Sequence, residues 1–158
     1  MGIYSGANLT AVFTDLTEGN TPSLGDVFFG PGGKVYKFVQ YAEGAAATAG
    51  VAGEVAYYYG ASGASAGDTT KVTSDLSDSI SVGAGVLQAA MSDGEYGWIQ
   101  TKGPATLTIA LTAGGDGAAL TPVGAGDGTL DVTATLTDPI CAFAIDATAK
   151  IIMCDFPW

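Results

Sequence analysis

The chain has 158 residues, of which 47% are hydrophobic and only 13% are charged, and its net charge is −11. Nucleic-acid binding depends on lysine and arginine for phosphate contacts, so this balance argues against a nucleic-acid partner and against anionic membrane surfaces. The five basic residues are all lysines, and histidine is absent. The commonest general base and a main transition-metal ligand are therefore missing, and we expect neither an enzyme nor a metal or cofactor site.

The length predicts a single domain over residues 1–158 with a sizeable core. Two interpretations of residues 1–24 stay open. Residues 9–16 form a first edge strand, closed by the turn-forming residues at positions 19–22, or the whole segment is an extended N-terminal arm that orders on a partner. The beginning of the chain lacks a basic and then apolar signal pattern, and no apolar run reaches the length of a membrane span.

The next segments favour short strands. Residues 24–29 and 34–41 flank a Gly-Pro-Gly-Gly turn, the pattern of a hairpin. Residues 42–50 are small and alanine-rich and predict a loop or one to two helical turns. Residues 51–59 predict a strand that ends in Tyr57, Tyr58 and Tyr59. We expect alternate tyrosines to pack inward and the others to cover a neighbour; the alternative is an exposed aromatic platform for a ligand such as a glycan.

The centre of the chain holds the most distinctive block. Residues 98–102 alternate, beginning with Trp98, and predict a strand that follows Gly97; Gly103-Pro104 is expected to end it. Residues 105–111 place apolar side chains at every second position and predict a further strand. Trp98 is expected to be a large anchor in the core. A Gly/Ala/Ser loop over residues 60–68 and a strand over 70–76 precede this block.

The C-terminal third predicts strands at residues 129–136, 141–145 and 150–154. Asp-Gly pairs favour turns between strands, and Asp68, Asp93, Asp116 and Asp127 are interpreted as solvated turn carboxylates. Cys141 and Cys154 are expected to be small buried residues in adjacent strands, with a disulfide left open because its geometry is not encoded in spacing. The sum is an all-β protein: one compact β-barrel or β-sandwich of about ten short antiparallel strands.

The order of several blocks resembles the small capsid decoration (cement) proteins of tailed bacteriophages. These blocks are the hairpin at residues 25–40, the segment Asp-Gly-Glu-Tyr-Gly-Trp-Ile-Gln-Thr-Lys-Gly-Pro-Ala at 93–105, a late Gly-Asp-Gly at 126–128 and the tail at 154–157. The resemblance implies a protein made in the host cytoplasm and placed on the outer surface of the virion. It would bind the major capsid protein, lock neighbouring capsomers and form a homo-oligomer, with a trimer favoured over a dimer. It carries no catalytic residues.

The candidate interface or core anchors are aromatic: Trp98, Tyr57, Tyr58, Tyr59, Phe28, Phe29 and Trp158. Two other hypotheses remain beside the decoration protein. One is a phage head-fibre or other virion glycan-binding module, which rests on the tyrosine triplet. The other is a glycan hydrolase that uses paired carboxylates, the only acid–base groups abundant in the chain.

Overall fold

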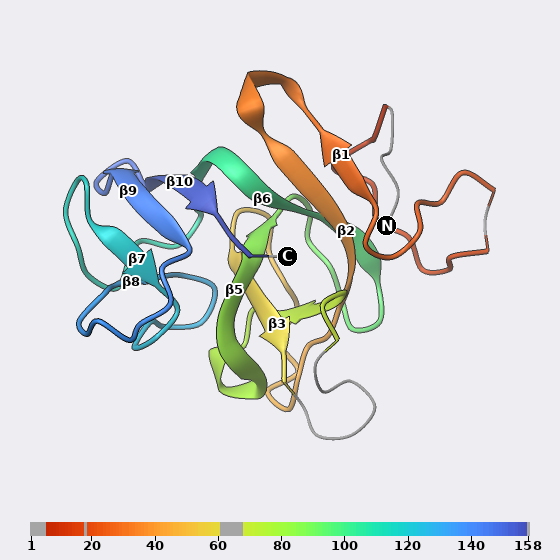
Figure 1. Cartoon of the computed structure of the whole chain (residues 1–158). Coiled ribbons are helices and arrows are strands. Elements are labelled where there is room, and N and C mark those ends of the chain that lie inside the picture. Colours follow the sequence, from red (N-terminus) through yellow and green to blue (C-terminus); the bar gives the residue numbers. More distant parts are fainter. Residues whose placement is uncertain (1–5, 18, 61–67, 158) are drawn as a thin grey trace.

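The structure is a computed structural model that describes residues 6–17, 19–60 and 68–157 (Figure 1). The chain is nearly all β, with 39% of it in strands, which confirms the predicted class. The strands are β1 (Val27–Phe29), β2 (Val35–Tyr41), β3 (Val55–Tyr59), β4 (Lys71–Thr73), β5 (Ser79–Leu87), β6 (Tyr96–Thr106), β7 (Ala119–Thr121), β8 (Asp131–Val132), β9 (Ala142–Asp146) and β10 (Ile151–Asp155). Two single 3-10 turns, η1 (Pro31–Gly33) and η2 (Leu76–Asp78), complete the regular structure of these ranges. No helix in the described ranges is long and apolar enough to span a membrane.

Five strands close into a barrel in the order β2-β4-β3-β5-β6, because β6 pairs with β2 as well as with β5. Closure leaves none of these five strands as a free edge for unwanted pairing. The predicted hairpin is present: β1 pairs with β2 across η1, with Phe29 opposite Val35. One barrel pair departs from the expected antiparallel arrangement, since β2 and β4 run parallel, with Gln40 opposite Lys71. Residues 42–50 form a loop without a helix.

The predicted strand end at Gly103-Pro104 is wrong, because β6 continues through both residues to Thr106. The reason is that β10 supplies a new partner strand, with Cys154 opposite Gly103 and Met153 opposite Pro104. Gly103 has a φ of +87°, so it bends the strand out of the barrel and toward β10 instead of reversing the chain. The strand expected over residues 105–111 accordingly ends at Thr106.

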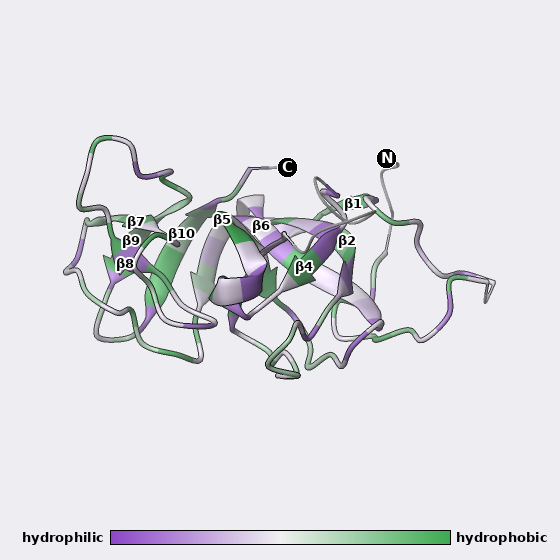
Figure 2. Cartoon of the chain, turned by 90° about the horizontal axis from the view of Figure 1, so that it is seen from below, coloured by the Kyte–Doolittle hydropathy of each residue, from purple (hydrophilic) through white to green (hydrophobic). Residues whose placement is uncertain are grey.

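The structure has three apolar cores. The hydrophobic segments that supply them lie both in the barrel strands and in the C-terminal strands (Figure 2). The first fills the barrel and includes Tyr41, Tyr58, Leu87 and Ile99. The second lies between the barrel and the C-terminal strands: it joins side chains of β3 and β5, such as Tyr57 and Val86, to side chains of β7, β9 and β10, such as Leu120 and Ile152. The third lies on the outside of the barrel. It consists of the buried rings of Tyr36, Phe38 and Trp98, with partly buried side chains of the N-terminal segment and β1 packed against them.

The described part of the N-terminal segment, residues 6–17 and 19–24, is an arm that contains no strand. Among its described residues, only Phe13 makes a β-bridge, to Tyr96. The backbone of this segment runs beside β1 and β2 and then loops away from them (Figure 1). Its apolar side chains pack against the third core, where the Phe13 ring meets the Phe38 ring edge-on at 5.7 Å. Its apolar side chains therefore act as a cover for a surface that two barrel strands would otherwise expose. The structure shows it ordered against its own barrel.

We expect Trp98→Ala to destabilise the protein by about 3–5 kcal/mol, because the ring is buried and packs against Phe38 at 5.3 Å and Phe28 at 6.4 Å. The measurement is the free energy of unfolding in urea. Phe29→Ala is the matched control, since Phe29 is 58% exposed and its loss should cost less than about 1 kcal/mol. Equal losses for the two variants would contradict the assignment of Trp98 to the third core.

Gly103→Val should destabilise the chain by more than about 2 kcal/mol, because a β-branched residue is strained at positive φ. A Cβ at this position would also lie 3.1 Å from the backbone of Gly33 and Lys34. Gly115→Val is the control, since Gly115 has open space around it and no positive φ. Thermal melting of both variants tests the bend in β6; similar melting temperatures for the two would count against it.

Candidate functional site

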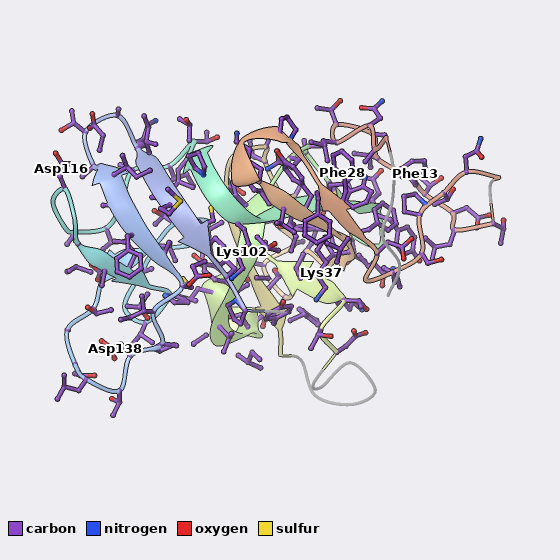
Figure 3. All side chains as sticks on the ribbon, turned by 45° about the horizontal axis from the view of Figure 1, so that its top comes forward. Phe13, Phe28, Lys37, Lys102, Asp116 and Asp138 are labelled. Carbon is purple, nitrogen blue, oxygen red and sulfur yellow. The ribbon has the colours of Figure 1, made fainter. Side chains whose placement is uncertain are left out.

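The predicted aromatic anchors divide into buried and exposed side chains. Trp98 is 1% exposed and Phe28 is half-buried, with its ring stacked on Tyr36 at 6.0 Å (Figure 3). Both belong to the third core, so neither presents a ring to a partner. Phe29 is 58% exposed and is open to contact. Trp158 lies outside the described residues.

The tyrosine triplet forms no exposed platform. Tyr57 points into the second core, and its hydroxyl lies 3.0 Å from the carbonyl oxygen of Gly126 and bonds that of Thr129. Tyr58 points into the barrel and donates to the carbonyl of Pro157 at 2.7 Å. Tyr59 is half-buried beside the ammonium of Lys71, which lies 5.2 Å from the centre of its ring. Successive residues of β3 thus face two different cores, which removes the geometry that a glycan platform requires.

A buried lysine joins three segments of the barrel and was not singled out by the sequence pattern. The Nζ atom of Lys37 donates to the carbonyl of Thr69 at 2.7 Å and lies 3.4 Å from the hydroxyl of Tyr58 (Figure 3). Burial lowers the pKa of Lys37, and nearby Asp68 offsets part of this effect. Through these two contacts the ammonium of Lys37 links β2 to β3 and to the segment before β4.

Most of the carboxylates are structural groups that bond the protein backbone. Most of the acidic side chains accept a hydrogen bond from a backbone N–H, and these are Asp15, Asp26, Glu54, Asp68, Asp75, Asp78, Asp93, Glu95, Asp116, Asp127, Asp131, Asp138 and Asp146. At Asp138, bonds from the side chain and backbone of Thr135 and from the Ala134 N–H lower the carboxyl pKa. Figure 3 shows Asp116 and Asp138 in the loops around β7 to β9. The interpretation of four of these residues as turn carboxylates agrees with these bonds.

The side chains that support covalent or metal chemistry are sparse. Within residues 6–17, 19–60 and 68–157, no group of three or more His, Cys, Asp or Glu side chains is arranged to hold a metal ion. Cys141 and Cys154 are both buried and both free. Burial raises the pKa of each thiol to about 12, so very little reactive thiolate exists at neutral pH.

The strongest candidate for an interaction surface is the outer side of β9 and β10, where Phe143, Ile145 and Met153 are 43%, 44% and 42% exposed. We call these three side chains the apolar face. Phe143 lies directly opposite Met153 in the ladder, so the two side chains are neighbours. The residues that alternate with them, including Ala144 and Ile152, are buried in the second core. A sheet with one side on a core normally carries polar residues on its other side, so this face is atypical of a solvated surface.

Two exposed residues of the connection between β8 and β9, Leu136 and Ile140, add to the apolar character of this end of the molecule. Sequence reasoning missed the whole surface, although it placed both strands. The sequence signal that could have revealed this surface is that apolar and polar residues do not alternate in β9 and β10. The runs Cys-Ala-Phe-Ala-Ile and Ile-Ile-Met-Cys are apolar at successive positions, which is typical of strands covered on both faces.

No protein-family model matches the chain, and no curated protein or solved structure shows a significant similarity to it.

Stability should fall above about pH 9. Unfolded thiols titrate near 8.5 and unfolded tyrosines near 10. In the folded chain burial raises the pKa of Cys141, Cys154 and Tyr58 to about 12. Groups whose folded pKa is raised contribute stability that is complete below the unfolded pKa and is lost as the pH rises toward the folded pKa.

The urea midpoint measured at pH 7, 9 and 10.5 tests this expectation. Lys37, whose pKa is lowered by burial, acts in the opposite sense at high pH, so the comparison between variants is decisive. Cys154→Ala removes one of the buried thiols and should flatten the decline. An identical pH dependence in the variant and the parent would show that this thiol does not titrate as the structure requires.

Proposed function

We propose that the protein is a structural component of a phage virion that binds the outer surface of the capsid and stabilises contacts between neighbouring capsomers. The observation that carries this proposal is the apolar face of Phe143, Ile145 and Met153, because exposed apolar patches of this kind mark protein–protein contacts. The occupant that we assign to it is the major capsid protein. The homo-oligomeric state, with a trimer favoured, rests on the resemblance in sequence.

The arrangement of cores supports a role in which the protein is a rigid spacer or clamp. The apolar face lies on a sheet that is anchored to the barrel through β6, so force applied at β9 and β10 passes into hydrogen-bonded strands. The backbone bonds of the acidic side chains hold the connecting loops in place. A protein with this function needs interface area and stiffness rather than reactive groups.

The resemblance to decoration proteins involves residues that build the scaffold. The block 93–105 becomes most of β6, the strand shared by the barrel and the C-terminal sheet, together with the turn that precedes it. The alternative of a glycan-binding module has lost its main support, since Tyr57 and Tyr58 are buried. The hydrolase hypothesis is weakened in the same way, because the carboxylates that prompted it are bonded to loop backbone.

The first test is co-sedimentation of the purified protein with expanded empty phage heads. We expect saturable binding at a fixed ratio to the capsid protein. Ile145→Ser should weaken it roughly tenfold, by removing apolar area from the interface. Ile80→Ser is the matched control, since Ile80 is an equally exposed isoleucine on β5, away from the apolar face.

Three outcomes would overturn parts of the proposal. Failure of the parent protein to pellet with heads removes the capsid assignment. Equal binding by Ile145→Ser and Ile80→Ser leaves the capsid role but removes the apolar face as its surface. Light scattering of the free protein is a separate measurement, and a monomeric mass at all concentrations would remove the oligomer.

A further inference from the structure

We propose that the pocket between the ends of β5 and β6 is a binding site for a carboxylate group, supplied by an acidic side chain or a chain terminus of a peptide partner. The pocket has a volume of about 340 Å³, and none of the three residues of the apolar face lines it. Its lining includes Lys34, Gly53, Gln88, Gln100, Thr106 and Thr108. The inference does not depend on the proposed capsid function.

The pocket exists because β6 leaves the barrel at this point. Only Val86 and Leu87 of β5 pair with β6, opposite Gln100 and Ile99. Beyond them β6 bends at Gly103 toward β10, so the two strands separate and leave a wedge. A wedge formed by strand pairing is part of the scaffold and is present before any ligand binds.

One buried side chain supports the wall of the wedge. Gln100 is 2% exposed, and its amide nitrogen donates to the carbonyl of Lys102 at 3.0 Å and to that of Pro104 at 2.9 Å. These bonds fix the backbone of β6 where β5 no longer accompanies it. The wall is therefore rigid, which lowers the entropic cost of binding a small group.

The polar groups of the pocket favour a negatively charged ligand. Among the described residues, the ammonium of Lys34 has no hydrogen-bond or ion-pair partner. The amide nitrogen of Gln88 donates to the carbonyl of Val86 at 2.9 Å, which leaves its second N–H available. Thr106, an exposed residue of the lining, has a hydroxyl as a further donor group. An ammonium, an amide and a hydroxyl together match the two oxygens of a carboxylate.

The charges around the pocket also favour a negatively charged ligand, although the chain as a whole has a net charge of −11. Lys150 donates to the carbonyl of Thr108 at 2.8 Å and adds a second positive charge beside the pocket. Lys102 is neutralised by Asp155 in a salt bridge across β6 and β10. Glu54, the acidic residue adjacent to Gly53, is held by the Val51 N–H. The lining residues themselves include one cation and no anion.

A carboxylate fits this site better than a phosphate. Phosphate sites use several converging donors, such as arginine forks or successive backbone N–H groups at a helix N-terminus. The pocket offers one ammonium and two neutral donors and lies at strand ends. A singly charged planar group is the ligand that these donors satisfy.

The test is an NMR titration of the full chain with acetyl-Gly-Glu-Gly-amide, followed through the signals of Gly53, Thr106 and the side-chain amides of Gln88 and Gln100. We expect saturable shifts confined to the pocket, and none with acetyl-Gly-Gln-Gly-amide. Lys34→Gln should weaken binding about tenfold or more through loss of a charged hydrogen bond. Lys71→Gln is the matched control because Lys71 lies on β4 beside Tyr59.

Titrations with acetate and with inorganic phosphate distinguish the possible sources of the negative charge. Acetate that binds as tightly as the glutamate peptide would overturn the assignment to a peptide partner, and tighter binding of the peptide would support it. The proposal is overturned if the pocket signals do not shift, if both peptides shift them equally, or if the two lysine variants behave alike. Inorganic phosphate that binds more tightly than acetate would overturn the assignment to carboxylates.

Discussion

The pairing of β6 with three other strands is the constraint on which the rest of the structure depends. Its first half closes the barrel against β2 and β5, and its second half carries β10 and through it the C-terminal sheet. The change of partner takes place at Gly103, where a positive φ bends the strand. A single strand therefore fixes the positions of all three cores, the pocket and the apolar face relative to one another.

Much of the fold was accessible from the sequence because alternation and turn chemistry act over short distances. The class, the approximate number of strands and the hairpin around Gly30–Gly33 follow from such local patterns. Gly103-Pro104 shows where local reasoning fails. The same dipeptide that ends many strands acts here as a bend, because a distant strand, β10, continues the hydrogen-bond ladder.

The candidate surfaces were harder to predict, since they depend on what each side chain meets across the fold. Trp98 was expected to be an anchor and is buried, yet nothing local indicates that it lies outside the barrel, packed against side chains of the N-terminal arm. Phe143 and Met153 were placed in strands, but their exposure follows from the fact that no further layer of described residues covers that side of the sheet. The pocket arises from a gap between strands that are close neighbours in the barrel.

The bonds between carboxylates and loop backbone have a consequence for the charge of the molecule. An aspartate that holds a loop carries its negative charge wherever the loop happens to lie, so the acidity of this chain is in large part a by-product of how its connections are built. Charge and architecture cannot then be adjusted separately. Replacing these aspartates to make the protein more neutral would loosen its connections, and a descendant that kept the same loops would inherit the same acidity whatever partner it came to bind.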